Sequence, residues 1–315
     1  MIPRIVVLAD TAAQVVRPVT REVCTAAQRI ADAVDLPWGV IVPAASVTGL
    51  EDIPTVVRVD TLAEAVPDVR ASALTEVCRE CAYVMMAHTT GGGDLMARMA
   101  QHLDVPLAAD CVGLTVEDQQ VRFVRALYGG KVLSTVRITA RPIMATFRPR
   151  SLPSLFVGEN CAVTQTVSVE LATPLSTVSQ VAEAVRDRLD VTEADIVISG
   201  GRGMQGPEQW GVLEELAAAF GPRATLACSR PVSDNGWRPR NEHVGQTGRA
   251  ISPDLYIACG ISGAIQHVAG IARSRCIVAI NKDPDAPIFK VADYGIVGDL
   301  FDVVPALTAA IRQLR

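Results

Sequence analysis

The chain has 315 residues, a length that indicates two domains at roughly 100–200 residues each. Hydrophobic residues make up 49% and charged residues 20%, which is typical of a globular protein and excludes a disordered one. The net charge of −5 argues against a nucleic-acid-binding protein, and no apolar run is long enough for membrane insertion. The opening run MIPRIVVL is too short for a secretion signal, so we expect a cytoplasmic protein or one of a matrix-like compartment.

The first half of the chain alternates short apolar runs with segments of helical periodicity. Strands are expected over 5–9, 38–42, 56–59 and 83–87, and helices over 18–34, 61–81 and 94–102, although Pro67 interrupts the second helix. This alternation predicts a parallel sheet with helices on both faces. The pattern then becomes β-rich, with strands over 120–127, 131–140 and 143–147, and residues 148–160 have the composition of a linker.

The second half resumes the alternation. Strands are expected over 163–171, 194–199, 224–227, 255–259, 276–280 and 294–297, and helices over 178–189, 210–220, 264–272 and 300–314. We therefore predict an α/β protein with two Rossmann-like parallel-sheet domains. The first domain covers 1–160, a crossing segment and the start of the second domain cover 161–190, and the body of the second domain covers 191–315.

The eight cysteines are spread along the chain, several of them in apolar runs, and we expect them to be reduced and buried. Cys78 and Cys81 have the CxxC spacing. They lie near the end of a predicted helix rather than at a strand-to-helix turn, and no second pair completes a zinc site. Redox or metal use of this pair is therefore the disfavoured alternative, and we predict no bound metal.

Polar and glycine-rich loops follow the predicted strands of the second half. Ligands of open parallel sheets bind at the carboxyl ends of strands, where such loops converge. Four loops directly follow strands and a fifth has glycines around a polar pair: 199–203, 228–230, 260–267, 281–283 and 244–248. Each loop alone has a structural interpretation, because a glycine after a strand is most often a turn that needs a positive φ.

One of these loops has features suited to a phosphate group. Gly260 and Gly263 allow close approach of the backbone, and the following helix begins with the Ser262 hydroxyl and free N–H groups, which together favour a pyrophosphate. Arg202 and Arg230 add positive charge at the same edge. The five loops together predict a phosphate-bearing cofactor in the second domain.

The chain lacks the common catalytic motifs. Walker A, GxSxG and HExxH sequences are absent, and no pairing of a nucleophile with a base is visible. We therefore predict cofactor binding rather than covalent catalysis, with no catalytic residues. His267 lies in the first turns of the helix after Ser262, where a structural and a ligand-facing role are both open.

The strand-end loops also resemble a known family. The segments 199–203, 244–248, 255–267, 278–289 and 292–300 closely resemble the electron transfer flavoprotein alpha subunit. The resemblance spans roughly residues 194–315, and the N-terminal half is similar to the family's first domain in its organisation. It implies an FAD held in the C-terminal domain.

The resemblance also implies a place for each residue around the FAD. Arg230 would lie against the isoalloxazine ring, Gln246 and Thr247 near the ring and ribityl chain, and His267 near the pyrimidine O2. Arg230 and His267 would stabilise the negative charge of the reduced flavin. Further FAD-binding residues are expected along the cofactor. Those beside Gln246 are Val244 and Gly245, and those at the adenosine end are Asn281, Asp299 and Leu300. Those at the pyrophosphate are Arg202, Ser229, Ser262, Gly263, Ala264, Ile265 and Gln266.

The function implied by this resemblance is electron transfer. Such a chain pairs with a beta subunit that usually holds AMP, accepts electrons from a flavin-dependent dehydrogenase, and passes them singly to a quinone oxidoreductase or similar acceptor. It is an electron carrier without substrate turnover of its own. Two alternatives stay open: a subunit of an electron-bifurcating complex, with a second FAD in the beta subunit, and a structural or assembly subunit without flavin.

Overall fold

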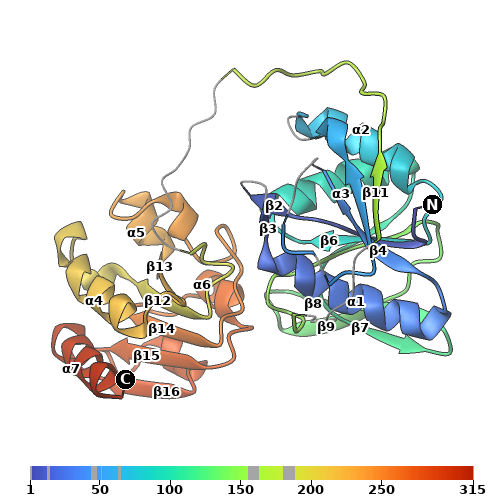
Figure 1. The fold of residues 1–315 in the computed structure, drawn as a ribbon. Helices are drawn as coiled ribbons and strands as arrows, with labels where there is room; N and C mark the ends of the chain where they lie inside the picture. Colours follow the sequence, from blue (N-terminus) through green and yellow to red (C-terminus); the bar gives the residue numbers. More distant parts are fainter. Residues whose placement is uncertain are drawn as a thin grey trace. The chain divides into compact units, whose positions relative to one another are not determined.

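The computed structural model describes residues 2–12, 15–43, 48–50, 52–62, 65–154, 163–179 and 189–314. The chain divides into two compact units (Figure 1). The first comprises Met1–Ala126 with Leu133–Glu183, and the second comprises Leu127–Val132 with Ala184–Arg315. Within the described ranges, no helix combines the length and apolar character needed to cross a membrane.

The first unit is built on a sheet that has nine strands in the described residues, ordered β11-β5-β4-β1-β6-β10-β7-β8-β9. The strands from β11 to β7 are parallel, and β8 pairs antiparallel with β7. A short antiparallel pair, β2 (Thr11–Ala12) with β3 (Val15–Val16), stands apart. The strand bounds are β1 (Ile5–Leu8), β4 (Trp38–Val42), β5 (Thr55–Val59), β6 (Tyr83–Ala87), β7 (Leu107–Glu117), β8 (Gln120–Leu127), β9 (Val132–Val136), β10 (Ile143–Phe147) and β11 (Val163–Val167).

Helices cover both faces of this sheet. The core on one face is closed by α1 (Pro18–Val34), and the core on the other by α2 (Pro67–Cys78) and α3 (Thr90–Leu103). The helix expected over 61–81 begins only at α2, after a short 3-10 turn η1 (Asp60–Leu62), because proline has no N–H to donate and fits the first turn. Conversely, α3 begins four residues earlier than expected, since the Thr89 hydroxyl caps it by accepting from the Gly92 N–H at 3.0 Å.

The second unit contains a parallel sheet that has five strands in the described residues, ordered β13-β12-β14-β15-β16. In chain order this reads 2-1-3-4-5, a doubly wound arrangement in which the connections change direction between β12 and β14. Both units thus confirm the predicted α/β class. The strands are β12 (Ile196–Gly200), β13 (Ala224–Cys228), β14 (Leu255–Cys259), β15 (Ile277–Asn281) and β16 (Tyr294–Val297).

Two apolar cores lie on opposite faces of the second sheet. Helices α4 (Gly211–Phe220) and α7 (Leu300–Gln313) close one of them, and α6 (Ile265–Ile271) contributes to the other. A short helix α5 (Arg230–Asp234) follows β13 where a loop is expected, because Pro231 fits its first turn. The 3-10 turns of this unit are η2 (Arg202–Met204), η3 (Pro207–Trp210), η4 (Arg240–Glu242) and η5 (Pro287–Lys290).

Two elements are expected in the crossing region, and the described residues include one of them in full. The strand expected over 163–171 forms as β11, and it pairs in parallel with β5 at the edge of the first sheet rather than opening the second one. Alternation of side chains predicts a strand but carries no information about its partner. The helix expected over 178–189 falls largely on 180–188, and the linker expected over 148–160 falls partly on 155–160, both outside the described residues.

The cysteines in the described residues are free. All of them are buried except Cys276, which is half-buried, and Cys161 lies outside the described part of the chain. No group of three or more His, Cys, Asp or Glu side chains in the described ranges is placed to hold a metal ion.

Candidate functional site

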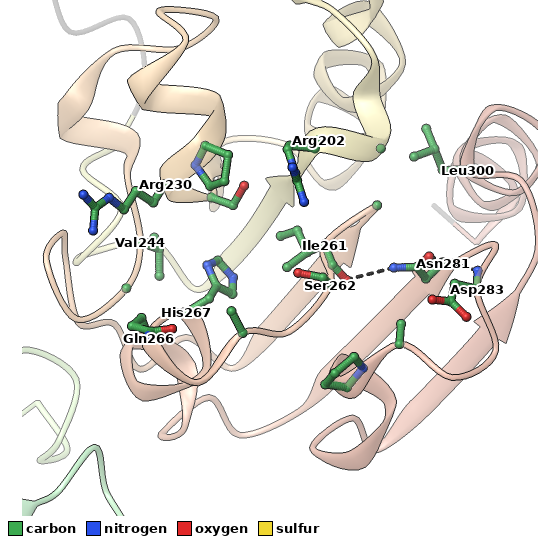
Figure 2. A pocket seen from close by; sticks show the side chains of 18 of the residues that line it. Arg202, Arg230, Val244, Ile261, Ser262, Gln266, His267, Asn281, Asp283 and Leu300 are labelled. Carbon is green, nitrogen blue, oxygen red and sulfur yellow. Dashed lines mark hydrogen bonds between the residues drawn. The ribbon is translucent and has the colours of Figure 1, made fainter.

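A pocket of about 500 Å³ lies in the second unit at the carboxyl ends of its strands (Figure 2). The segments that follow β12, β13, β14 and β15 all contribute to its lining, together with the loop 244–248 and the start of α7. The ends of β12 and β14 flank the point where the sheet changes direction, which is where doubly wound sheets bind their ligands. The volume falls within the range of about 300–1,000 Å³ that is usual for small-molecule sites.

Bare backbone forms part of the pocket wall between β12 and β14. The Gly201 N–H donates to the Cys259 carbonyl at 2.9 Å, and the Gly203 N–H donates to the Gly260 carbonyl at 3.1 Å. A Cβ atom on Gly203 would lie 2.6 Å from the Gly260 Cα, so a side chain there would force the two loops apart. Glycine at these positions therefore lets the two strand-end loops join directly.

The loop after β14 is held from its far side by the segment after β15. Gly263 has a φ of +83°, and a Cβ atom there would lie 2.3 Å from the Ile288 nitrogen. The Ile288 N–H donates to the Ser262 carbonyl at 3.0 Å, and the Asn281 side-chain amide donates to the Ile261 carbonyl at 2.9 Å (Figure 2). These contacts leave the exposed Ser262 hydroxyl at the pocket surface.

The two predicted arginines lie on different sides of the pocket. In Figure 2, Arg202 points toward Ile261 and Ser262, and it has no ion-pair partner in the described residues. Arg230 begins α5 and extends away from them. Its guanidinium pairs with Asp234 one helical turn later at 3.1 Å, and its side chain is 62% exposed, so it is free to rotate.

The loop 244–248 is joined to α6 by backbone contacts. The Gln246 N–H donates to the Gln266 carbonyl at 2.7 Å, and a Cβ atom on Gly270 would lie 2.6 Å from the backbone of Gly245. The Val244 N–H donates to the Cys228 carbonyl at 3.0 Å, which ties the same loop to the end of β13. The Gln246 and Thr247 side chains remain exposed beside the pocket.

His267 is buried in the pocket wall. Its Nε2 lies 2.7 Å from the Tyr256 hydroxyl, which comes from the interior of β14. Burial raises the pKa of Tyr256 well above its ordinary value, so the phenol keeps its proton and can donate to His267, with Ser199 beside it opposing this shift. Nδ1 has no hydrogen bond of standard geometry in the described residues, although the backbone of Val244 lies near the ring.

The charge state of His267 follows from its burial. Burial lowers the pKa of His267 to about 4, with the Val244 backbone opposing this shift. The imidazole is therefore neutral near neutral pH, and it can offer a ligand a hydrogen bond rather than a full positive charge. Positive charge at the pocket comes instead from Arg202, Arg230 and Lys282.

The structure brings nearly all of the predicted cofactor residues to one pocket. Gly263 and Ile265 are the exceptions: Gly263 is buried beneath the loop against Ile288, and the side chain of Ile265 is 71% exposed outside the pocket. Asp299, which caps α7 by accepting from the Phe301 N–H at 2.9 Å, lies with Leu300 at the same end as Asn281. The predicted residues that line the pocket are Arg202, Ser229, Arg230, Val244, Gly245, Gln246, Thr247, Ser262, Ala264, Gln266, His267, Asn281, Asp299 and Leu300.

Sequence reasoning missed several members of the site. Lys282, Asp283 and His243 line the pocket but were not assigned to it. Tyr256 lies behind it and was interpreted only as part of a buried strand. Its signal was present, since a tyrosine in an otherwise apolar strand usually finds a hydrogen-bond partner for its hydroxyl, and His267 follows it by 11 residues.

Acidification is expected to weaken the fold through His267. Its pKa is about 4 in the folded chain, against an ordinary value of about 6.5 when unfolded. The unfolded chain binds more protons between these values, so the free energy of unfolding falls as the pH drops through this window. From about pH 7 to about pH 5 we expect a loss of about 2 kcal/mol from this group.

Urea unfolding followed by tryptophan fluorescence at the two pH values measures this effect. His267→Gln removes this titrating group and should reduce the pH dependence. His88 and His243, whose pKa values burial also lowers, would still contribute to it. Replacement of the exposed His102 by glutamine is the control. Equal pH dependence in His267→Gln and the unchanged chain would rule out this role of His267.

Comparison with known proteins gives matches along both units. A family model described as the electron transfer flavoprotein FAD-binding domain matches residues 190–272, and one described as the electron transfer flavoprotein domain matches residues 5–175. The first match includes most of the loops that line the pocket, and the second covers more than half of the chain.

Curated relatives agree with these models. The electron transfer flavoprotein subunit alpha of Bacillus subtilis is 42% identical over 233 residues, which cover 74% of this chain and 71% of that protein. The subunit of the same name from Syntrophomonas wolfei is 41% identical over 231 residues, or 73% of this chain and 72% of that protein. The one from Pseudomonas aeruginosa is 39% identical over 264 residues, or 83% and 84%. The chain therefore belongs to the electron transfer flavoprotein alpha subunit family.

Proposed function

We propose that the pocket of the second unit holds one FAD and that the chain carries electrons as the flavin-bearing half of an alpha–beta heterodimer. The observation that carries this proposal is the meeting of four strand-end segments at the point where the second sheet changes direction. The match of residues 190–272 to an FAD-binding domain supports the choice of cofactor.

The residues of the pocket fit such a cofactor on three counts. The glycine contacts between the loops after β12 and β14 leave bare backbone where a bulky polyanion must come close. Arg202 supplies a positive charge without an ion-pair partner in the described residues, as a pyrophosphate requires. The buried Nδ1 of His267 lacks a standard hydrogen bond in the described part of the chain, which a carbonyl of the flavin ring would provide.

In this proposal, each group has its own role. Arg202, Ser229 and Ser262 bind the pyrophosphate, and Asn281 with Asp299 and Leu300 lie at the adenosine end. Arg230 is the mobile cation for the ring, and His267 is a neutral hydrogen-bonding group. FAD, when bound, supplies the ability to take up and release single electrons.

A beta subunit is the proposed partner. The second unit exposes apolar side chains along β16, at the edge of its sheet, where Tyr294, Ile296 and Val297 are all accessible. An exposed apolar sheet edge of this kind is typical of a surface that a partner covers. We propose that the first unit also contributes to this interface, that a flavin-dependent dehydrogenase donates electrons, and that a quinone oxidoreductase accepts them. A cytoplasmic location and the lack of substrate turnover stay predictions.

Flavin content tests the proposal. We expect the chain, co-expressed with a beta-type subunit from the same source, to purify with one FAD per alpha chain and AMP in the partner. Denaturation followed by chromatographic identification of the released nucleotides gives both counts. Release of FMN, or of no flavin after incubation with excess FAD, would contradict the proposal, and two FAD per heterodimer would favour the bifurcating alternative.

A further inference from the structure

A pair of cysteines in the first unit lies in a backbone geometry that can accept a disulfide. Cys78 ends α2, and Cys81 lies just before β6. The Cys81 N–H donates to the Cys78 carbonyl at 3.0 Å, which closes a four-residue turn. Such a turn places its first and fourth Cα atoms within about 7 Å, and disulfides join Cα atoms about 4.4–6.8 Å apart. The bond can therefore form without moving either element far.

The two thiols differ in the way that a nucleophilic and a resolving cysteine differ. A hydrogen bond between them raises the pKa of the fully buried Cys78 and lowers that of Cys81, as expected if Cys78 donates to the Cys81 sulfur. Arg4 also lowers the pKa of Cys81, while burial and Glu80 oppose it. When protonated, the Cys81 thiol donates to the Pro3 carbonyl at 3.5 Å.

Other buried cysteines of the chain have no comparable activation. Burial raises the pKa of Cys24, Cys111, Cys228 and Cys259 to about 12 in each case. The thiolate is the nucleophile in thiol–disulfide exchange, so these residues are poor reactants at neutral pH. Cys81 is thus set apart by its environment as well as by its spacing from Cys78.

A cavity of about 430 Å³ borders Cys81 but not Cys78. It opens at the amino ends of the strands of the first sheet, and Cys81 is part of its lining. Its lining includes three basic residues, Arg4, Arg79 and Arg141, and one acidic residue, Glu80. Arg79 is paired with Glu76, whereas Arg141 lies over the Tyr83 ring at 5.4 Å from its centroid. This basic rim favours an anionic reagent.

We propose that Cys78 and Cys81 form a reversible dithiol–disulfide site that reacts with small anionic disulfides entering through this cavity. The Cys81 thiolate attacks one sulfur of the small disulfide, forming a mixed disulfide and releasing one thiolate. Cys78 then loses its proton and attacks the Cys81 sulfur, releasing the second thiol. The protein thiols give up two electrons and two protons, and the small disulfide is reduced to two thiols. The proposal does not depend on the flavin site.

Peptide mapping under non-reducing conditions tests the proposal on the full chain purified with its partner. After incubation with glutathione disulfide, we expect a crosslink between Cys78 and Cys81 that dithiothreitol reverses. Cys78→Ser should instead trap glutathione on Cys81, and Cys81→Ser should form neither product. Cys276→Ser, which removes the half-buried cysteine, is the matched control and should leave the crosslink unchanged.

The rate of crosslinking tests the basic cavity separately, in a chain that keeps both cysteines. Arg4→Gln should slow the reaction with glutathione disulfide by at least about threefold, and the cationic disulfide cystamine should react more slowly than glutathione disulfide with the unchanged chain. Absence of the crosslink, a mixed disulfide that persists on Cys81 in the unchanged chain, or faster reaction with cystamine would overturn the proposal. FAD content, measured in the same samples, reports independently on the second unit.

Discussion

Replacement of Gly263 by alanine is expected to remove FAD from the protein and to destabilise the second unit. Gly263 has a φ of +83°, which costs an L-residue about 1–2 kcal/mol. Its new Cβ atom would also lie 2.3 Å from the nitrogen of Ile288, a backbone atom that cannot rotate away. We expect a total loss of about 2–4 kcal/mol. Because Ser262 and Ala264 line the pocket on either side, the same displacement should disrupt cofactor binding.

Gly236 provides a matched control for this substitution. It has a similar φ of +72°, but a Cβ atom there would have no other atom within 4 Å. Gly236→Ala should therefore cost only the backbone strain, about 1–2 kcal/mol, and keep its flavin. Flavin absorbance per protein and the thermal midpoint should be measured on both variants. The comparison separates the backbone strain of a positive φ from the clash of the new Cβ atom with Ile288. Full flavin content and unchanged stability in Gly263→Ala would show that the loop after β14 adapts, and would contradict a rigid contact between Gly263 and Ile288.

Arg230→Ala is expected to lower the midpoint potential of the bound flavin while leaving FAD in place. The guanidinium favours the reduced, negatively charged ring over the neutral oxidised one, and it keeps its charge at all working pH values. The side chain is 62% exposed and paired with Asp234, so solvent weakens its effect. We expect about 1 kcal/mol, the lower end for a charged donor, which corresponds to roughly 40 mV for one electron.

Two further variants sharpen this test. Arg230→Lys keeps the charge but loses the planar fork, and should recover part of the potential. Asp234→Asn removes the carboxylate that competes for Arg230 at 3.1 Å, and should shift the potential in the opposite direction to Arg230→Ala. Stepwise reduction against a reference dye, followed by absorbance, gives the potentials. If all three variants match the unchanged protein, Arg230 does not act on the flavin ring.

Much of the fold could be predicted because the central strands are buried on both faces. Strands such as β1 and β4 are continuous apolar runs between segments of helical period, and α1 runs from Pro18 to Val34 as its periodicity indicates. The partner of β11 could not be predicted, because pairing with β5 depends on residues more than a hundred positions away. The start of α3 could not be predicted either, because the Thr89 hydroxyl that caps the helix opposes the low helix propensity of the three glycines that follow.

The pocket was predictable to the extent that its residues directly follow strands. Parallel strands bring their carboxyl ends to one edge, so loops far apart in sequence had to meet there. Contacts that depend on side-chain direction were not predictable. The Arg230–Asp234 pair is an example, because its four-residue spacing is meaningful only once α5 is known to be helical. The hydrogen bond from Tyr256 to His267 likewise depends on how α6 packs against β14, which brings the two side chains together.

The direct joining of the loops after β12 and β14 has a consequence for how this site tolerates mutation over time. The groups that form this wall, Gly201, Gly203 and Gly260, interact through main-chain N–H and carbonyl groups. Main-chain groups are the same in every residue, so no substitution can remove their donors and acceptors, except a proline. Substitution can only add bulk between the loops. Substitutions at these positions would therefore disturb this part of the site through the size of the new side chain and not through its polarity.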